Sequence, residues 1–154
     1  MADPQVCPFC IIDEARQKPL LKDKNVYVMQ SHPQLVPLHL LVIPTRHVEF
    51  PWKLTVEEHQ EITLTTLALQ QKMLEFRDGW GCDVTQHCRP FQPQDERKVD
   101  HCHWHIRPRT YFDELYQEVQ RHETALFTKG RLALEKMEEE AVILRVILGL
   151  RPRS

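Results

Sequence analysis

The stretch His101-Cys102-His103-Trp104-His105-Ile106 decides how this chain folds. Side chains of a β-strand point alternately to its two faces, so a strand here places three imidazoles on one face. Cys102, Trp104 and Ile106 point to the other face, where we expect the core. Core packing explains the even positions and leaves the histidines unexplained. Because imidazole can act as a nucleophile, exchange protons near neutral pH or bind a metal, the run predicts a functional site.

The remaining chain predicts an α+β fold. Residues with a high propensity for strands, together with turn signals between them, predict strands over 25–31, 38–43 and 81–86. The histidine strand should end at Pro108. Thr55 to Glu58 has the pattern of a helix capping box, and the helix should run to about Arg77. Residues 87–98 read as a loop, and 113–127 and 131–148 as helices. This order predicts an antiparallel β-meander sheet with a long helix after its second main strand and additional C-terminal helices.

The long helix carries an apolar stripe that we expect to be core. Its members recur at helical spacing. They are Ile62, Leu69, Met73 and Phe76, widened by Leu67 and Leu74.

Composition limits the classes of protein that this chain can join. Its 154 residues suit one domain, and a net charge of −2 gives no general attraction to nucleic acid. Nothing resembles a signal peptide, and the apolar stretch 141–150 is too short to span a bilayer and contains Arg145. We therefore expect a soluble cytoplasmic protein without nucleic-acid or membrane partners. In that compartment its five cysteines are thiols or metal ligands rather than disulfides. Cys102 is expected in the core, and Cys82 and Cys88 are unassigned.

Cys7-Pro8-Phe9-Cys10 has the spacing that lets two thiolates hold one zinc ion. The chain has no second such pair, so the other two ligands must come from elsewhere. His47 follows the second strand and His101 heads the histidine run, which together predict a four-ligand structural zinc site. A redox pair or two free thiols are the alternatives.

These motifs resemble the histidine triad (HIT) family. Its motif is His-x-His-x-His followed by apolar residues, preceded by a proline, a histidine and an apolar strand ending in Ile-Pro, as in residues 37–44. Arg109 after Pro108 fits the family's ending. The N-terminal cysteine pair, with His47 and His101, resembles the zinc-containing bacterial branch. The resemblance covers about residues 7–109, so the chain should be a single histidine triad domain with a C-terminal helical extension over about 111–150.

The resemblance implies a chemistry. Family members are hydrolases or transferases of nucleotides, acting on phosphoanhydride or phosphoramidate bonds at the α-phosphorus. His103, the middle histidine, would be the nucleophile and form a nucleotidyl-histidine that water then cleaves. His105 and His39 would face the phosphate and share its charge and protons. Transferase branches carry glutamine at the third position, so His105 favours hydrolysis.

Several expected substrate-binding positions differ from the family pattern. Where the family has Gly-Gln-Ser or Gly-Gln-Thr before the triad, this chain has Glu96, Arg97 and Lys98. Arg97 and Lys98 either contact phosphate or are solvated loop charges. Gln30 or Ser31 takes the place of a ribose-binding carboxylate or amide. Gln86 fits the position of an amide near the scissile bridge.

Two other functions compete with the hydrolase. One is a zinc-stabilised module that binds a nucleotide or a partner protein with little turnover. The other is a catalytic zinc held by His101, His103 and His105, which ranks last because residues i and i+4 of a strand lie roughly 13 Å apart.

The resemblance implies that the protein is a homodimer. The stretch 141–150 gives an independent reason, because it is apolar nearly all round and a monomer would leave part of it exposed. It should be buried by a second subunit or fold back over its own domain, and we favour the dimer.

Overall fold

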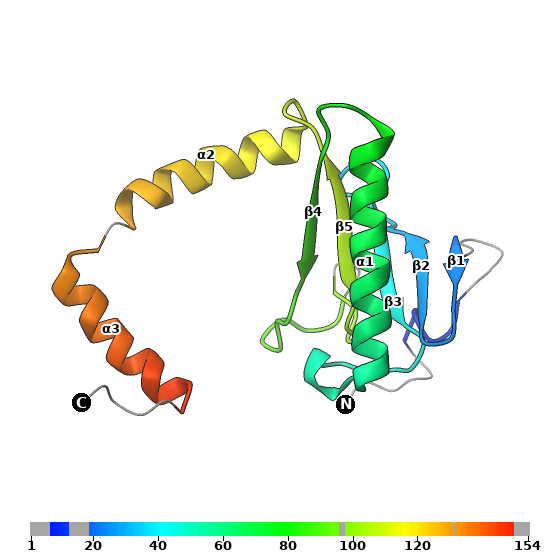
Figure 1. The fold of residues 1–154 in the computed structure, drawn as a ribbon, viewed down its shortest axis with the longest axis horizontal. Coiled ribbons are helices and arrows are strands. Elements are labelled where there is room, and N and C mark those ends of the chain that lie inside the picture. Colours follow the sequence, from blue (N-terminus) through cyan, green and yellow to red (C-terminus); the bar gives the residue numbers. More distant parts are fainter. Residues whose placement is uncertain (1–6, 13–18, 96–97, 131, 150–154) are drawn as a thin grey trace. The chain divides into compact units, whose positions relative to one another are not determined.

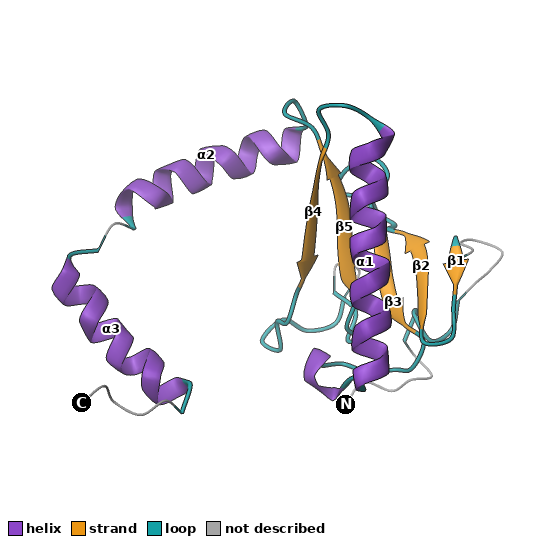
Figure 2. Ribbon diagram, in the orientation of Figure 1, coloured by secondary structure: helices purple, strands orange, loops and turns teal. Residues whose placement is uncertain are grey.

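The computed structural model describes residues 7–12, 19–95, 98–130 and 132–149. Two compact units divide the chain, Met1–Tyr116 and Gln117–Ser154, and the boundary falls near the start of a helix. The first unit holds a five-stranded antiparallel sheet and one long helix, whereas the second consists of helix (Figures 1 and 2). The predicted α+β class is therefore confirmed. The organisation as one domain over residues 1–154 stays a prediction.

The predicted strands and helices occur in the predicted order, and the structure adds the short strand β1 and the 3-10 turn η1, which were not predicted. The strands are β1 (Leu21–Lys22), β2 (Val26–Gln30), β3 (Leu40–Pro44), β4 (Gly81–Gln86) and β5 (Trp104–Arg109). The helices are the 3-10 turn η1 (Pro51–Lys53), α1 (Val56–Phe76), α2 (Glu114–Lys129) and α3 (Leu134–Ile147). None of these described helices is long and apolar enough to cross a membrane.

The sheet runs in the order β1-β2-β3-β5-β4, and all its pairs are antiparallel. The chain leaves β3, passes through α1 and returns as a β4–β5 hairpin, so that β5 lies beside β3 (Figure 1). This order puts β5 near the centre of the sheet. A residue on β5 therefore has neighbours on β3 and on β4, and Leu41 and Thr85 both lie opposite His105.

The predicted histidine strand begins later than expected. β5 starts at Trp104, so His101, Cys102 and His103 precede it. The reason is Pro44 at the end of β3, which has no N–H to donate to the ladder. Instead, the Cys102 N–H donates to the Val48 carbonyl oxygen at 2.6 Å. The expected alternation still holds: Cys102 and Ile106 are buried in the core, with Trp104 packed against it.

Helix α1 begins as predicted and covers one face of the sheet (Figure 1). The Thr55 side chain accepts from the Glu58 N–H, and the Glu58 carboxylate accepts from the Thr55 N–H, which completes the capping box. Glu58 is also held by Arg46, whose Nε and Nη2 donate to its two carboxylate oxygens. The start of α1 is thereby tied to the turn that follows β3.

The apolar stripe of α1 is narrower than predicted. Ile62 is buried, and Leu69 and Met73 pack against the core. The prediction is wrong for Leu67, Leu74 and Phe76, which are exposed. Leu67 and Leu74 lie over 100° around the helix from Ile62, so that a flat sheet cannot reach them. Phe76, in the last turn, packs edge-on against Trp80 instead.

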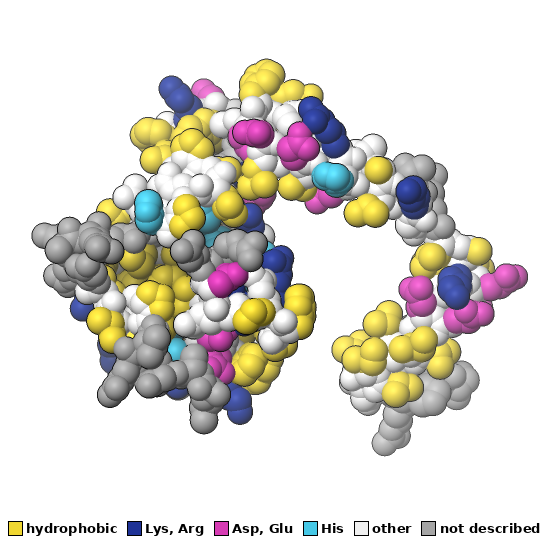
Figure 3. Space-filling model, turned by 180° about the vertical axis from the view of Figure 1, so that it is seen from behind, with side chains coloured by type: hydrophobic (Ala, Val, Ile, Leu, Met, Phe, Trp, Pro, Cys, Tyr) yellow, Lys and Arg dark blue, Asp and Glu magenta, His cyan; other side chains and the backbone are white. Residues whose placement is uncertain are grey.

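The second unit carries many exposed apolar side chains. No residue of α3 is buried, and Figure 3 shows hydrophobic side chains gathered over this helix. The exposed residues of α3 and its end are Leu134, Met137, Val142, Ile143, Leu144, Val146, Ile147 and Leu148. The apolar stretch predicted from residue 141 onward is therefore present, and Leu150 lies outside the described residues.

Candidate active site and metal centre

Two histidines that are distant in sequence meet on the face of the sheet opposite α1. His39 stands just before β3, and His105 lies on β5, where it pairs with Leu41. His39 Nε2 lies 3.0 Å from His105 Nδ1. The turn before His39 places Leu38 at a left-handed φ of 62°, a conformation that residues other than glycine rarely adopt. The Ser31 N–H donates to the His39 carbonyl oxygen at 2.8 Å and fixes this turn to the end of β2.

The hydrogen-bond partners assign the tautomers of this pair. The Leu35 N–H donates to His39 Nδ1 at 3.4 Å, so that Nδ1 is the acceptor and Nε2 carries the proton. His39 Nε2–H then donates to His105 Nδ1. The proton of neutral His105 is left on Nε2. A chain of two imidazoles thus ends in an N–H donor, of the kind that a phosphate oxygen accepts from.

His103 has the opposite arrangement. Its Nδ1 lies 2.7 Å from the His101 carbonyl oxygen, which can only accept, so Nδ1 carries the proton. The lone pair of the neutral ring is therefore on Nε2. The His103 and His105 rings lie 4.8 Å apart between centroids. One imidazole with a free lone pair and one with a free N–H consequently stand side by side.

Burial keeps these histidines neutral. It lowers the pKa of His39 to about 4, with a smaller contribution from Arg107. It lowers the pKa of His105 to about 2, helped by His103 and His39. The pKa of His103 is also lowered, chiefly by burial. Neutral imidazoles are required both for a nucleophile and for the directed hydrogen bonds just described.

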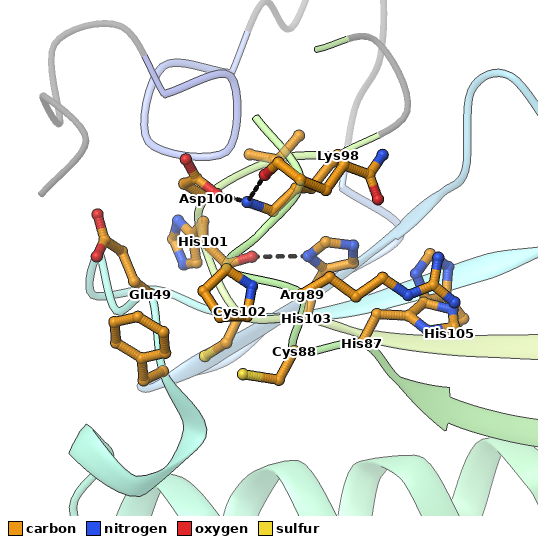
Figure 4. A pocket seen from close by; sticks show the side chains of 14 residues that line it. Glu49, His87, Cys88, Arg89, Lys98, Asp100, His101, Cys102, His103 and His105 are labelled. Atoms are coloured by element: carbon orange, nitrogen blue, oxygen red, sulfur yellow. Dashed lines mark hydrogen bonds and ion pairs between the residues drawn. The ribbon is translucent and has the colours of Figure 1, made fainter. Parts of the chain in front are cut away.

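His103 and His105 open into a cavity of about 460 Å³, whereas His39 lies buried behind His105 and does not line it. Figure 4 shows His103 and His105 in its wall together with His87 and Arg89 from the loop after β4. The His87 ring lies 5.1 Å from that of His105. Sequence reasoning missed His87 and Arg89. For His87 the alternation of the strand predicted over 81–86 was a partial signal, because His87 continues the face of Thr85, which the structure places opposite His105.

The structure brings only some of the predicted substrate-binding residues to this cavity. Lys98 lines it, but its ammonium group is engaged by Asp100 and by the Gln92 carbonyl oxygen. Ser31 is buried beside His39, and its hydroxyl donates to the Pro33 carbonyl oxygen. Arg97 lies outside the described residues.

Gln30 and Gln86 are placed differently. Gln86 lies opposite Trp104, so it is on the α1 side of the sheet, and its amide donates to the His87 carbonyl oxygen. Gln30 lies opposite Leu40 at the exposed end of β2. Neither lines the cavity. The roles expected for these residues stay predictions.

The predicted metal ligands form a second cluster next to the histidines. Ligand atoms of Cys7, Cys10, His47 and His101 all lie within 4.8 Å of one another. His47 Nδ1 is 3.3 Å from Cys10 Sγ, and His101 Nδ1 is 3.5 and 3.7 Å from Cys7 and Cys10 Sγ. A tetrahedral zinc with ordinary bond lengths needs ligand separations of about 3.4–3.8 Å. The cluster therefore fits such an ion with little movement.

The surroundings of His101 prepare it as a ligand. Its Nε2 lies 2.9 Å from the Pro44 carbonyl oxygen and must donate, so the Nδ1 lone pair faces the thiols. Burial lowers the pKa of His101 to about 4, which keeps the ring neutral. Burial and Cys7 raise the pKa of Cys10 to about 11. A bound metal would have to displace that proton, so affinity should depend on pH.

Phe9 connects the two clusters. It stands between the two cysteines, in a turn where the Cys10 and Ile11 N–H groups donate to the Cys7 carbonyl oxygen. Its ring meets His101 edge-on at 5.8 Å and His103 at 5.1 Å between centroids. The Tyr27 hydroxyl donates to the Phe9 carbonyl oxygen at 2.7 Å. The cysteine turn thus also supports the ring of His103.

The fold is that of histidine triad proteins. A hypothetical protein from Leishmania major is 20% identical, with a TM-score of 0.61 over 82% of this chain and 99% of its own. A HIT-like protein involved in cell-cycle regulation from Bartonella henselae is 20% identical, with a TM-score of 0.61 over 74% and 83%. A Zn-bound histidine triad family protein from Mycobacterium smegmatis is 22% identical, with a TM-score of 0.58 over 73% and 81%.

A family model makes the assignment more specific. Residues 1–108 match the family described as "Protein similar to CwfJ C-terminal", and the chain belongs to that family. The match includes the cysteine turn, all the histidines of both clusters and β5 up to Pro108.

The lowered pKa values predict how stability depends on pH. In the unfolded chain His39 titrates near 6.5, but in the folded protein near 4. Between these values the unfolded state binds more protons than the folded state. The free energy of unfolding is therefore highest above pH 6.5 and decreases as the pH falls toward 4. The slope should reach about 1.4 kcal/mol per pH unit for each such histidine.

Urea unfolding of the wild type and of His39→Gln between pH 4 and 7 measures this slope. The variant should depend less steeply on pH. His59→Gln, at an exposed position of α1, removes a histidine without touching the cluster and should keep the wild-type slope. Equal slopes for the wild type and His39→Gln would contradict the assignment of His39 as a buried neutral ring.

Proposed function

We propose that this chain is a cytoplasmic nucleotide hydrolase of the histidine triad type, cleaving a phosphoanhydride or phosphoramidate bond at the α-phosphorus of a nucleotide conjugate or dinucleoside polyphosphate. The observation that carries the proposal is the pair of neutral rings in one cavity. His103 offers an Nε2 lone pair, and His105 beside it offers an Nε2–H donor. Similarity to histidine triad folds and membership of the family given above support it.

In this reaction His103 Nε2 attacks the α-phosphorus, and the bond from phosphorus to the leaving group breaks. The new N–P bond makes a nucleotidyl-histidine, and the leaving group departs with the electron pair. Water then attacks the same phosphorus, the N–P bond breaks, and His103 is restored. His105, held by His39, donates to a phosphate oxygen and stabilises the charge that builds on it. Two moderate barriers replace one high barrier.

A second function, a nucleotide- or partner-binding module with little turnover, is favoured by one observation. The positions where the family carries hydroxyl and amide groups before the triad hold other residues here, and Lys98 among them is engaged by Asp100. Under this alternative the cavity binds a nucleotide, but the second step is slow.

His103→Ala separates the two functions. Loss of a nucleophile costs several kcal/mol, so the variant should lose at least about 1,000-fold in turnover while it keeps its fold. The measurement is product chromatography with a panel of dinucleoside polyphosphates and nucleoside phosphoramidates. Acid quenching should trap a nucleotidyl group on the wild type and none on the variant. His59→Ala is the matched control. A variant with more than about a tenth of the wild-type rate would exclude covalent catalysis by His103.

We also propose that Cys7, Cys10, His47 and His101 hold a structural zinc ion, as in the zinc-containing branch of the family. Four protein ligands leave no open position, so the metal would fix the cysteine turn rather than activate water. Metal analysis should find about one zinc per chain. Cys10→Ser should lose zinc and thermal stability together. Cys88→Ser, an exposed thiol outside the cluster, should lose neither. A wild type purified without chelator, with reduced thiols and without metal, would refute the site.

The exposed apolar surface of α3 supports a homodimer, which we propose as the solution state. Val142, Ile143 and Leu144 are each more than half exposed. A single chain rarely leaves so large an apolar surface in water. Light scattering at micromolar concentration should give twice the chain mass, and Ile143→Glu should shift it toward the monomer, since the dimer would bury an unpaired carboxylate. Glu139→Gln, which changes the charge at an exposed position of the same helix, is the control and should leave the mass unchanged. A monomeric wild type would exclude the dimer.

A further inference from the structure

Cationic side chains collect at one end of the histidine cluster. Arg107 follows His105 on β5 by two residues and so lies on the same face of the sheet. Arg89 stands in the loop after β4 and lines the cavity with His87. Figure 4 shows the Arg89 side chain extending toward His87 and His105. Both arginines act on His87, whose pKa is lowered by burial and then by Arg89 and Arg107.

Neither arginine makes an ion pair within the described part of the chain, although Asp83 lies opposite Arg107 in the β4–β5 ladder and acts on it electrostatically. Arg46 is paired with Glu58, Lys98 with Asp100, and Arg109 with Asp113 and Asp83. Arg107 donates from Nη2 to the Thr85 hydroxyl, and its buried Nε has no partner among the described groups.

The carboxylates of the cavity stand at the opposite end. Figure 4 shows Glu49 and Asp100 near His101, away from His105 and Arg89. The electrostatic potential along the cavity therefore becomes more positive from His101 toward His105 and Arg89. An anion placed against His105 has the two guanidinium groups beyond it, while Asp83, which faces Arg107 from β4, is ion-paired with Arg109.

The other half of the same sheet face is apolar. Tyr27, Met29, Leu41 and Ile43 form a buried cluster there, with Phe9 packed against it. A nucleotide conjugate has an aromatic base at one end and a leaving group at the other. The apolar half is already buried beneath Phe9, so a substrate meets only the residues that line the cavity, and an anionic leaving group matches their arginine end. A neutral amine leaving group would offer neither guanidinium group a negative charge.

We propose that Arg89 and Arg107 form a leaving-group subsite that selects substrates whose leaving group is a phosphate or polyphosphate. This inference rests on the proposed hydrolase function of the same cavity. When His103 bonds to the α-phosphorus, the bond from that phosphorus to the bridging oxygen breaks, and the electron pair stays on the oxygen. The guanidinium groups stabilise the phosphate anion that leaves, by charge-assisted and bidentate hydrogen bonds.

Inorganic tripolyphosphate tests the subsite without any turnover. Calorimetric titration of the full-length protein as purified, at fixed ionic strength, should show binding that Arg107→Gln and Arg89→Gln each weaken about tenfold. Arg77→Gln, at the C-terminal end of α1 where it lies over Trp80, removes the same charge elsewhere and should bind like the wild type. If Arg107→Gln fails to fold by circular dichroism, Arg89→Gln in the loop decides alone. Equal affinity for the wild type and the folded variants would overturn the subsite.

Turnover then tests its role in selection. Diadenosine tetraphosphate and an adenosine phosphoramidate with an uncharged amine leaving group form the substrate pair. The wild type should prefer the tetraphosphate in kcat/KM, and Arg89→Gln should lower this preference about tenfold. A wild type that prefers the phosphoramidate, or a variant with an unchanged preference, would overturn the inference and leave the hydrolase intact. A wild type that cleaves neither but binds tripolyphosphate through the arginines would refute the hydrolase and retain the anion subsite.

Discussion

The antiparallel pairing of β3 with β5 is the constraint on which both clusters depend. Its register sets Leu41 opposite His105, so that His39, just before β3, comes within hydrogen-bond distance of His105. At the other end the pairing stops at Val42 and Trp104, two residues before Pro44, which has no N–H for the ladder. The segment 101–103 therefore turns away from β3, and its backbone binds Val48 instead. That departure carries His101 to the thiols and leaves His103 between the two clusters. A shift of one residue in this register would separate all of these groups.

The metal cluster and the triad share more than a neighbouring position. His101 belongs to the first, yet its carbonyl oxygen holds the Nδ1 proton of His103 and so determines which nitrogen of His103 has the lone pair. Phe9, fixed by the cysteine turn and by Tyr27, packs against both rings. A zinc ion in the cluster would stabilise His101 and the cysteine turn at once. It would thereby hold the proposed nucleophile from two sides while taking no part in the reaction.

The sequence was informative where a pattern has a single physical reading. Alternation in the histidine run correctly separated Cys102, Trp104 and Ile106 from the imidazoles, and the capping box located the start of α1. It was less informative where the outcome depends on contacts between distant segments. The late start of β5 follows from Pro44, which is remote in sequence, and Phe76 contacts Trp80 rather than the sheet and stays exposed. Arg89 stands in a charged loop, where sequence alone does not distinguish a cavity residue from a solvated one.

Burial and Arg107 act in the same direction on the pKa values of His39 and His105. Desolvation lowers the pKa values of His39 and His105, and Arg107 lowers both further. Neutral rings provide a lone pair and directed N–H donors, but they provide no net charge for an anion. In the proposed reaction the guanidinium groups supply that charge, since arginine stays protonated even when half buried. The cations that attract the substrate therefore also help to keep the imidazoles in the form that the first step requires.

A bound phosphate would reverse part of this effect, because its negative charge favours protonation of a nearby imidazole. Substrate binding would thus raise the proton affinity of His39 and His105 at the stage when the leaving group needs charge stabilisation.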